Sequence, residues 1–245
     1  MLKTTLLGLF FGTIGTTIGG LIGITTKKNT NKFLSFVLSF ASGLMLAVVC
    51  FSLIPEALNI LDISLVTTGI ITGIVCMIIC ESWINKKFES DVLENKEKAR
   101  ILKTGIIVSI GLAIHNIPEG IAIGSGFAES ATLGLSLAIA ICMHDIPEGL
   151  SMAVPMKRGG MKSWKIMLYV ILSGLATGIG TLIGAWIGNI SEQVISMCLS
   201  FAAGAMLYIV SGELIPEYNK LYQGRLSGIG NIAGFIIGLF AMIMF

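Results

Sequence analysis

The chain has 245 residues, of which 54% are hydrophobic and only 12% are charged, and its mean hydropathy is +0.90. Soluble domains carry about 25% charged residues, so this composition excludes an ordinary soluble domain and indicates an integral membrane protein. The formal net charge of +2 gives no indication of a nucleic-acid partner.

Membrane spans of roughly 20 apolar residues can be followed along the whole chain. The run after Lys3 resembles a signal peptide, but it has no A-x-A site and ends at Lys27, so we interpret it as the first span. We therefore expect an all-α integral membrane fold in which residues 1–245 form one domain. Its eight predicted spans are about 4–25, 33–57, 63–84, 104–126, 130–155, 164–189, 193–217 and 226–245.

Basic residues are concentrated in alternate loops. The loops after spans one, three, five and seven hold fifteen of the sixteen lysines and arginines, so these loops are expected to face the cytoplasm. Both termini are then expected outside, and residues 85–103 are expected to be a cytoplasmic loop. The fifteen residues are Lys27, Lys28, Lys32, Lys86, Lys87, Lys96, Lys98, Arg100, Lys103, Lys157, Arg158, Lys162, Lys165, Lys220 and Arg225.

An internal repeat joins the second and seventh spans. SFASGLMLAVVCFSLIPEAL (39–58) aligns without gaps on SFAAGAMLYIVSGELIPEYN (200–219), with 11 of 20 positions identical. The charge pattern orients the two spans in opposite directions, so the repeat is predicted to be inverted. Inverted repeats are typical of secondary transporters, whose substrate sites lie between the repeats. The predicted arrangement is three spans, a central pair and three further spans.

The central pair carries the two histidines of the chain, in HNIPEG (115–120) and HDIPEG (144–149). In each motif the His and the Glu are four residues apart and share one helix face, and the Asn or Asp lies about 60° from the Glu. We therefore expect six side chains to converge on one cavity: His115, Asn116, Glu119, His144, Asp145 and Glu148.

The three carboxylates of this group are costly in a membrane. Each costs roughly 2.5–3.5 kcal/mol at a helix centre, about 10 kcal/mol in all if nothing neutralises them. The two spans contain no Lys or Arg near these carboxylates, so protons or a cation must neutralise them. Imidazole, carboxylate and amide oxygen together suit a divalent transition ion such as zinc, iron or manganese. A purely structural role is the alternative for one such residue, but two copies of the motif favour a metal site.

HNIPEGIAIG and HDIPEGLSMA resemble the signature motifs of the ZIP (Zrt-, Irt-like) family of metal transporters, on its fourth and fifth spans. The resemblance covers essentially the whole chain, including the eight spans and the loop after the third. It implies transport of divalent metal into the cytoplasm, with zinc expected first and iron, manganese or cadmium as alternatives. It also implies a multi-pass protein of the plasma membrane, commonly a homodimer, with no enzymatic activity and no cofactor besides the transported ion.

The resemblance implies two metal positions. Met45 of the second span is a candidate soft ligand at the first position, and Glu119 and Glu148 would bridge the two ions. The first position is matched by His115, Glu119, His144 and Glu148, and the second by Asn116 and Asp145 together with the bridging carboxylates.

The sixth span departs from the family pattern. The family often has a Glu there, within a pattern like SGLxEPLGA, whereas this chain reads SGLATGIGTLIGA (173–185). Thr177 therefore stands in place of the Glu and Gly178 in place of the Pro. A neutral hydroxyl is a poor substitute for a carboxylate, so the second ion is expected to bind weakly.

Glu213 lies in the seventh span, one turn before Glu217, and no positive partner is visible in the sequence. We predict that Glu213 is a ligand on the exit path at the cytoplasmic side. The alternative is that it only faces cytoplasmic water.

An intramembrane metal-dependent hydrolase is the rival function, because it would use similar ligands to activate a water molecule. The sequence argues against it. It contains no H-E-x-x-H motif and no carboxylate left over to act as general base, and an inverted repeat has no catalytic purpose.

Overall fold

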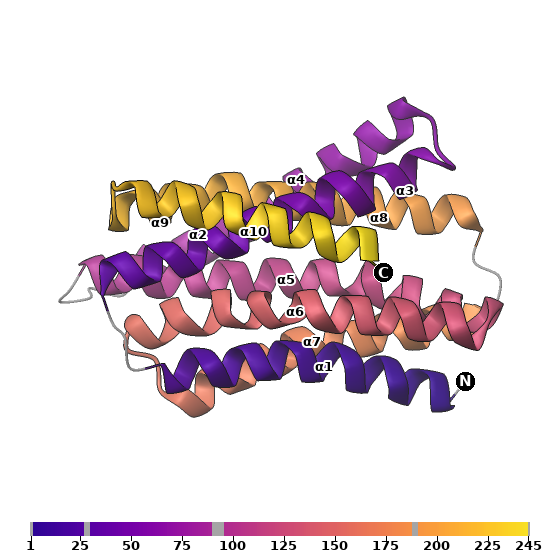
Figure 1. Ribbon diagram of the computed structural model, residues 1–245, viewed down its shortest axis with the longest axis horizontal. Helices are drawn as coiled ribbons and strands as arrows, with labels where there is room; N and C mark the ends of the chain where they lie inside the picture. The colour runs from indigo at the N-terminus through magenta and orange to yellow at the C-terminus, as the bar shows by residue number, and fades with distance from the viewer. Residues whose placement is uncertain (1, 27–29, 90–95, 188–190, 245) are drawn as a thin grey trace.

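The computed structural model describes residues 2–26, 30–89, 96–187 and 191–244 (Figure 1). Within these ranges all regular structure is helical, so the predicted all-α class is confirmed. Two short segments, η1 and η2, are π-helical. The elements are α1 (Leu2–Thr25), α2 (Asn31–Val48), η1 (Val49–Leu53), α3 (Ile54–Leu58), α4 (Ile63–Glu89), α5 (Lys96–Glu129), α6 (Ala131–Arg158), α7 (Ser163–Ile187), α8 (Glu192–Tyr208), η2 (Ile209–Leu214), α9 (Ile215–Leu221) and α10 (Arg225–Met244).

Seven helical segments in the described ranges are long and apolar enough to cross a membrane, and they correspond to the first seven predicted spans. The eighth predicted span falls on α10, where Arg225–Phe240 forms a shorter apolar stretch. The integral membrane class is thus confirmed, and the eighth crossing stays a prediction. The seven segments are Thr4–Thr25, Asn31–Leu58, Ile63–Trp83, Glu97–Ala128, Leu137–Arg158, Ser163–Trp186 and Ser196–Leu221.

The predicted loop 85–103 is largely helical. Helix α4 continues to Glu89 and α5 begins at Lys96, so only residues 90–95 separate them, and these lie outside the described residues. The apolar pattern ends before either helix does, because polar helix ends in water show no apolar periodicity. Arg100 therefore lies on α5 rather than in a loop.

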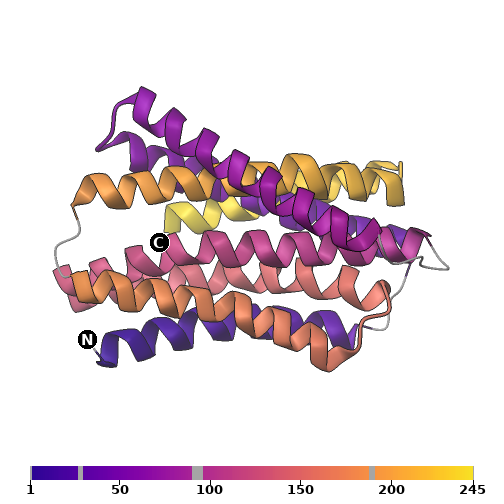
Figure 2. The ribbon, with the colours of Figure 1, turned by 180° about the vertical axis from the view of Figure 1, so that it is seen from behind.

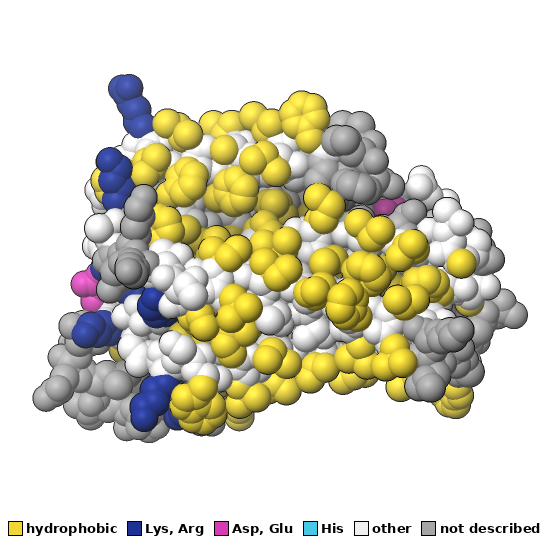
Figure 3. All heavy atoms as spheres, turned by 60° about the horizontal axis from the view of Figure 1, so that its bottom comes forward, with side chains coloured by type: hydrophobic (Ala, Val, Ile, Leu, Met, Phe, Trp, Pro, Cys, Tyr) yellow, Lys and Arg dark blue, Asp and Glu magenta, His cyan; other side chains and the backbone are white. Residues whose placement is uncertain are grey.

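Lysine and arginine side chains gather at one end of the molecule, and apolar side chains cover the face beside them (Figure 3). Lys157 at this end donates from Nζ to the carbonyl oxygens of Ile24 and Thr26, at 2.5 and 2.7 Å. A cation there satisfies carbonyls that the end of α1 leaves without helical partners. We call this end of the molecule the basic end.

The helices form two bundles, which Figures 1 and 2 show as two layers. In the first, α1 and α5 each pack against both α6 and α7. This bundle carries both histidine motifs, and we call it the motif bundle. In the second, α2 packs against α10, α9 against α2, and α4 against α8. We call it the companion bundle.

Reciprocal glycine contacts hold four helix pairs together. Each helix of a pair contributes one glycine that lies against a backbone carbonyl of the other helix. A Cβ added to either glycine would overlap that carbonyl oxygen. Small residues permit such close backbone approach in membranes. The glycines are Gly19 and Gly149 between α1 and α6, Gly120 and Gly180 between α5 and α7, Gly43 and Gly234 between α2 and α10, and Gly73 and Gly204 between α4 and α8.

These glycines extend the repeat beyond the 20 residues that the sequence comparison finds. The register of 161 positions that relates residue 39 to residue 200 also relates Gly19 to Gly180 and Gly73 to Gly234. Helices α1, α2 and α4 thus correspond to α7, α8 and α10. In Figure 1, α2 and α8 run in opposite directions, as an inverted repeat requires.

The two π-helical turns occupy equivalent places in the repeat. The N–H of Ile54 bonds to the carbonyl of Val49, and the N–H of Ile215 bonds to that of Val210. Each turn is followed by a proline, Pro55 or Pro216, which has no N–H to continue the helical ladder. Such π turns often occur at functional sites, and Glu213 lies within η2.

Gly234→Ala should destabilise the protein, because the added methyl would overlap the carbonyl oxygen of Phe40 and separate α2 from α10. Overpacking of this kind costs about 1–3 kcal/mol. Gly228→Ala on the same helix is the matched control, since a Cβ there meets nothing within 4 Å. Thermal unfolding in detergent measures both. Equal melting temperatures for the two variants would contradict the close contact.

Candidate metal site

Five of the six predicted motif residues have described side chains, and all five are buried within the motif bundle. The exposed fractions are 0% for His115, Asn116 and Asp145, 3% for Glu119 and 1% for Glu148. Helices α5 and α6 continue past Pro118 and Pro147, so each motif lies inside a long helix. Ionisable groups are therefore buried inside the motif bundle, together with small polar side chains such as Ser173 and Thr177.

His115 brings the two motifs together. Its Nε2 atom lies 3.0 Å from Oε1 of Glu119 on the same helix and 3.9 Å from Oε1 of Glu148 on α6. Two ligands of a tetrahedral zinc ion, each about 2 Å from the metal, lie roughly 3.3 Å apart. The two observed separations bracket this value, so a small adjustment would let these three side chains bind one ion.

Two of the predicted ligands are not seen beside this group. His144 lies in α6, and its side chain is outside those that the structure describes. Met45 is fully buried in the core. Among the described side chains, no group of three or more His, Cys, Asp or Glu residues meets the geometry of a bound metal.

Asn116 and Asp145 lie against different neighbouring helices. Nδ2 of Asn116 donates to the carbonyl oxygen and the Oγ of Ser173 on α7, at 3.0 and 3.4 Å. Its Oδ1 is buried and accepts no hydrogen bond from the described residues. Asp145 lies against α1, where a Cβ added to Gly15 would be 2.7 Å from the Cβ of Asp145. The amide oxygen of Asn116 could therefore coordinate a cation.

Thr177 lies where α1, α5 and α7 meet. It is fully buried one turn after Ser173, and its carbonyl oxygen faces Gly120 of α5. A Cβ added to Gly12 of α1 would be 2.6 Å from its Cγ2. Its Oγ1 has no hydrogen-bond partner among the described residues. The residue that replaces the family's Glu is therefore buried beside the residue that binds Asn116.

Glu213, the predicted exit ligand, is half-buried in η2. Its Oε2 accepts a hydrogen bond from the Thr104 hydroxyl of α5 at 3.5 Å. Glu217, one turn later, is 2% exposed and forms an ion pair with Arg100 that the sequence analysis missed. The pairing could not be predicted because Arg100 was assigned to the loop 85–103.

Comparisons with known proteins show which proteins the chain is similar to. A sequence profile described as "ZIP Zinc transporter" matches residues 85–245. The chain is 32% identical over 276 residues to "Zinc transporter ZupT" of Clostridium perfringens, an alignment that covers 100% of this chain and 96% of the relative. It is 30% identical over 247 residues to "Zinc transporter ZupT" of Streptococcus mutans, covering 95% and 94%. It is 37% identical over 138 residues to "Zinc transporter ZIP11" of Homo sapiens, covering 54% and 40%.

Thr177→Glu should add an oxygen ligand beside Asn116 and so tighten the binding of a second divalent ion. The added charge is tolerable only with a cation nearby, so zinc should raise the melting temperature of the variant more than that of the parent. Thr177→Gln has the same size without the charge and serves as the control. Titration calorimetry counts the bound ions. An unchanged stoichiometry together with an unchanged zinc-dependent shift would mean that Thr177 does not face the site.

Proposed function

The chain belongs to the ZIP family of zinc transporters, and we propose that it carries divalent transition-metal ions, zinc foremost, across the membrane into the cytoplasm. Iron, manganese and cadmium share the ligand preferences of the site and are the other candidate substrates. The family and its relatives are transporters, and the hydrolase alternative has no support among them.

One observation supports the site of transport above all others. Nε2 of His115 lies between carboxylates from two helices, in a part of the chain with no lysine or arginine between Lys103 and Lys157. Buried carboxylates need a cation, and imidazole with carboxylate suits zinc. A transported divalent ion would bring positive charge to these carboxylates.

In this proposal the two motifs hold the ion in the middle of the membrane. His115, Glu119, His144 and Glu148 replace the water shell of the ion, and Met45 approaches it when the bundles move. Asn116 and Asp145 receive a second ion, which Thr177 leaves weakly held. Acid should compete with metal, because imidazole and carboxylate bind it only when deprotonated.

The membrane topology completes the proposal. The charge pattern supports eight crossings with α10 as the last, both termini outside, and the basic end facing the cytoplasm. Glu213 in η2 lies toward this end, which supports its role as a ligand on the exit path. We further propose a homodimer in the plasma membrane, as is common in the family.

Uptake of radioactive zinc into proteoliposomes tests the transport function. The parent protein should give saturable zinc uptake, and Glu148→Gln should lose it while remaining folded, because the amide keeps the size of the side chain but removes the charged carboxylate that would bind the metal. Glu56→Gln is the matched control, since Glu56 also follows a proline but is exposed. No flux of zinc, iron, manganese or cadmium through the parent would refute the function. Parent-like flux through Glu148→Gln would refute the site.

A further inference from the structure

The ion pair between Arg100 and Glu217 joins the two bundles at the basic end. Nε of Arg100 lies 2.9 Å from Oε2 of Glu217, and Nη2 lies 3.3 Å from Oε1, so the guanidinium donates a hydrogen bond to each carboxylate oxygen. Arg100 belongs to α5 of the motif bundle, and Glu217 belongs to α9 of the companion bundle. The Glu217 side chain is only 3% exposed, whereas that of Arg100 is 39% exposed.

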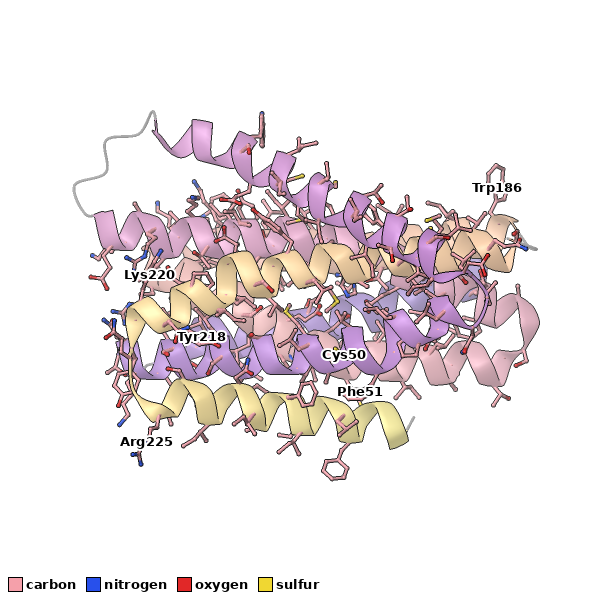
Figure 4. All side chains as sticks on the ribbon, turned by 90° about the horizontal axis from the view of Figure 1, so that it is seen from above. Cys50, Phe51, Trp186, Tyr218, Lys220 and Arg225 are labelled. Carbon is pink, nitrogen blue, oxygen red and sulfur yellow. The ribbon has the colours of Figure 1, made fainter. Side chains whose placement is uncertain are left out.

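Each partner is fixed within its own bundle. The Ser35 hydroxyl of α2 donates to the carbonyl of Tyr218 beside Glu217, at 2.9 Å, and lies 2.7 Å from the hydroxyl of Ser227 on α10. On the other side, Gly159 packs against Leu102 near the start of α5. Figure 4 shows Tyr218 and Lys220 of α9 at the basic end, far from Trp186 at the opposite end. The ion pair therefore connects α5 and α9, and each of these helices is held in place by its own bundle.

The contact closes a seam that leads toward the metal site. One turn deeper than Arg100, Thr104 of α5 bonds to Glu213 of η2. Deeper still, Ile107, Leu112 and Ile209 are fully buried, and Ile209 packs over Gly111. His115 follows on the same helix, fifteen residues and about 22 Å from Arg100. An ion leaving the motifs along this seam would have to pass Glu213 and then the ion pair.

The inverted repeat shows that the opposite end differs. Glu56 is the repeat equivalent of Glu217, at the same register of 161 positions. Glu56 is exposed, and the hydrogen bond shown for its carboxylate comes from Ser52 on its own helix. Equivalent carboxylates are thus clamped between the bundles at the basic end and exposed at the other.

We propose that Arg100 and Glu217 form the cytoplasmic gate of the transporter, an ion pair that is closed in this conformation and separates in each transport cycle. The pair suits this task because its two ends differ: separation returns the 39% exposed Arg100 guanidinium to water, whereas the Glu217 carboxylate, 3% exposed, then needs another cation or water beside it. A divalent ion at Glu213, one turn away, repels the guanidinium and attracts the carboxylate of Glu217. Arrival of the ion therefore favours opening. This inference depends on the proposed transport function.

A reversible cross-link tests the gate. In a variant whose five native cysteines are replaced by alanine, Arg100→Cys and Glu217→Cys are joined by a short bifunctional thiol reagent that contains a disulfide. Uptake of radioactive zinc into proteoliposomes is measured before cross-linking, after it, and after reduction. The gate predicts flux before cross-linking, loss of flux to the background of empty liposomes after it, and recovery on reduction. Zinc binding in detergent should survive the cross-link.

A cross-link within one bundle is the matched control. Ser42→Cys with Asn231→Cys places two thiols on α2 and α10 of the companion bundle, where Nδ2 of Asn231 donates to the Ser42 hydroxyl at 3.1 Å. The same reagent should leave zinc flux through this variant unchanged, because the two helices stay together throughout the cycle.

The outcomes separate the gate from the transport function. Cross-linked Arg100→Cys, Glu217→Cys protein that transports as fast as its reduced form overturns the gate. Loss of flux in the parent refutes the proposed function instead. If the reduced cysteine variant is inactive, the charge exchange Arg100→Glu with Glu217→Arg decides, because a gate made of one ion pair works with either orientation. Flux through the exchanged variant, absent in Arg100→Glu alone, supports the gate, and no flux through it overturns the gate.

Discussion

Buried negative charge is the constraint on which this structure depends. Glu119, Asp145 and Glu148 lie inside a helical bundle, at most 3% exposed, and the basic residues nearest to them in the sequence are Lys103 and Lys157 at its end. Carboxylates in hydrocarbon are costly unless a cation or a proton accompanies them. The chain keeps three of them inside one bundle, with the imidazole of His115 at 3.0 Å from Glu119, and the proposed metal ion accounts for this concentration of negative charge.

The rest of the fold holds these acidic side chains in place and forms the seam along which the ion is proposed to leave. Glycine–carbonyl contacts bring α1 and α7 directly against the motif helices, so that Ser173 reaches Asn116 and α1 covers Asp145. The same contacts recur in the companion bundle, because the glycines keep the register of the repeat. Two bundles, each tightly packed internally, meet along a seam that carries Glu213 and the Arg100–Glu217 pair. The proposed path of the ion follows this seam, which is polar at the basic end and lined by buried apolar side chains such as Ile107 and Ile209 nearer the metal site.

Much of this could be predicted from the sequence, for definite reasons. Apolar runs between charges give the helices, because the bilayer demands length and hydrophobicity from each span. Residues four apart share a helix face, so the approach of His115 to Glu119 follows from their spacing. The approach of His115 to Glu148 depends on how α5 and α6 pack, and only the repeated motif suggested it. The helical ends of the segment 85–103 were missed because polar helix ends resemble loops.

The inverted arrangement of three, two and three spans could also be predicted, because the repeat is written in the sequence beyond residues 39–58. At the same register of 161 positions, TTIGGLIG (16–23) aligns with TGIGTLIG (177–184), with six of eight positions identical. The role of its glycines, which is to let helix backbones touch, could be seen only in the packing. The most direct test of the account is anomalous diffraction at the zinc edge from crystals soaked in zinc. It should place an ion about 2 Å from Nε2 of His115 and from carboxylate oxygens of Glu119 and Glu148. Zinc bound only elsewhere on the protein, with none between α5 and α6, would contradict it.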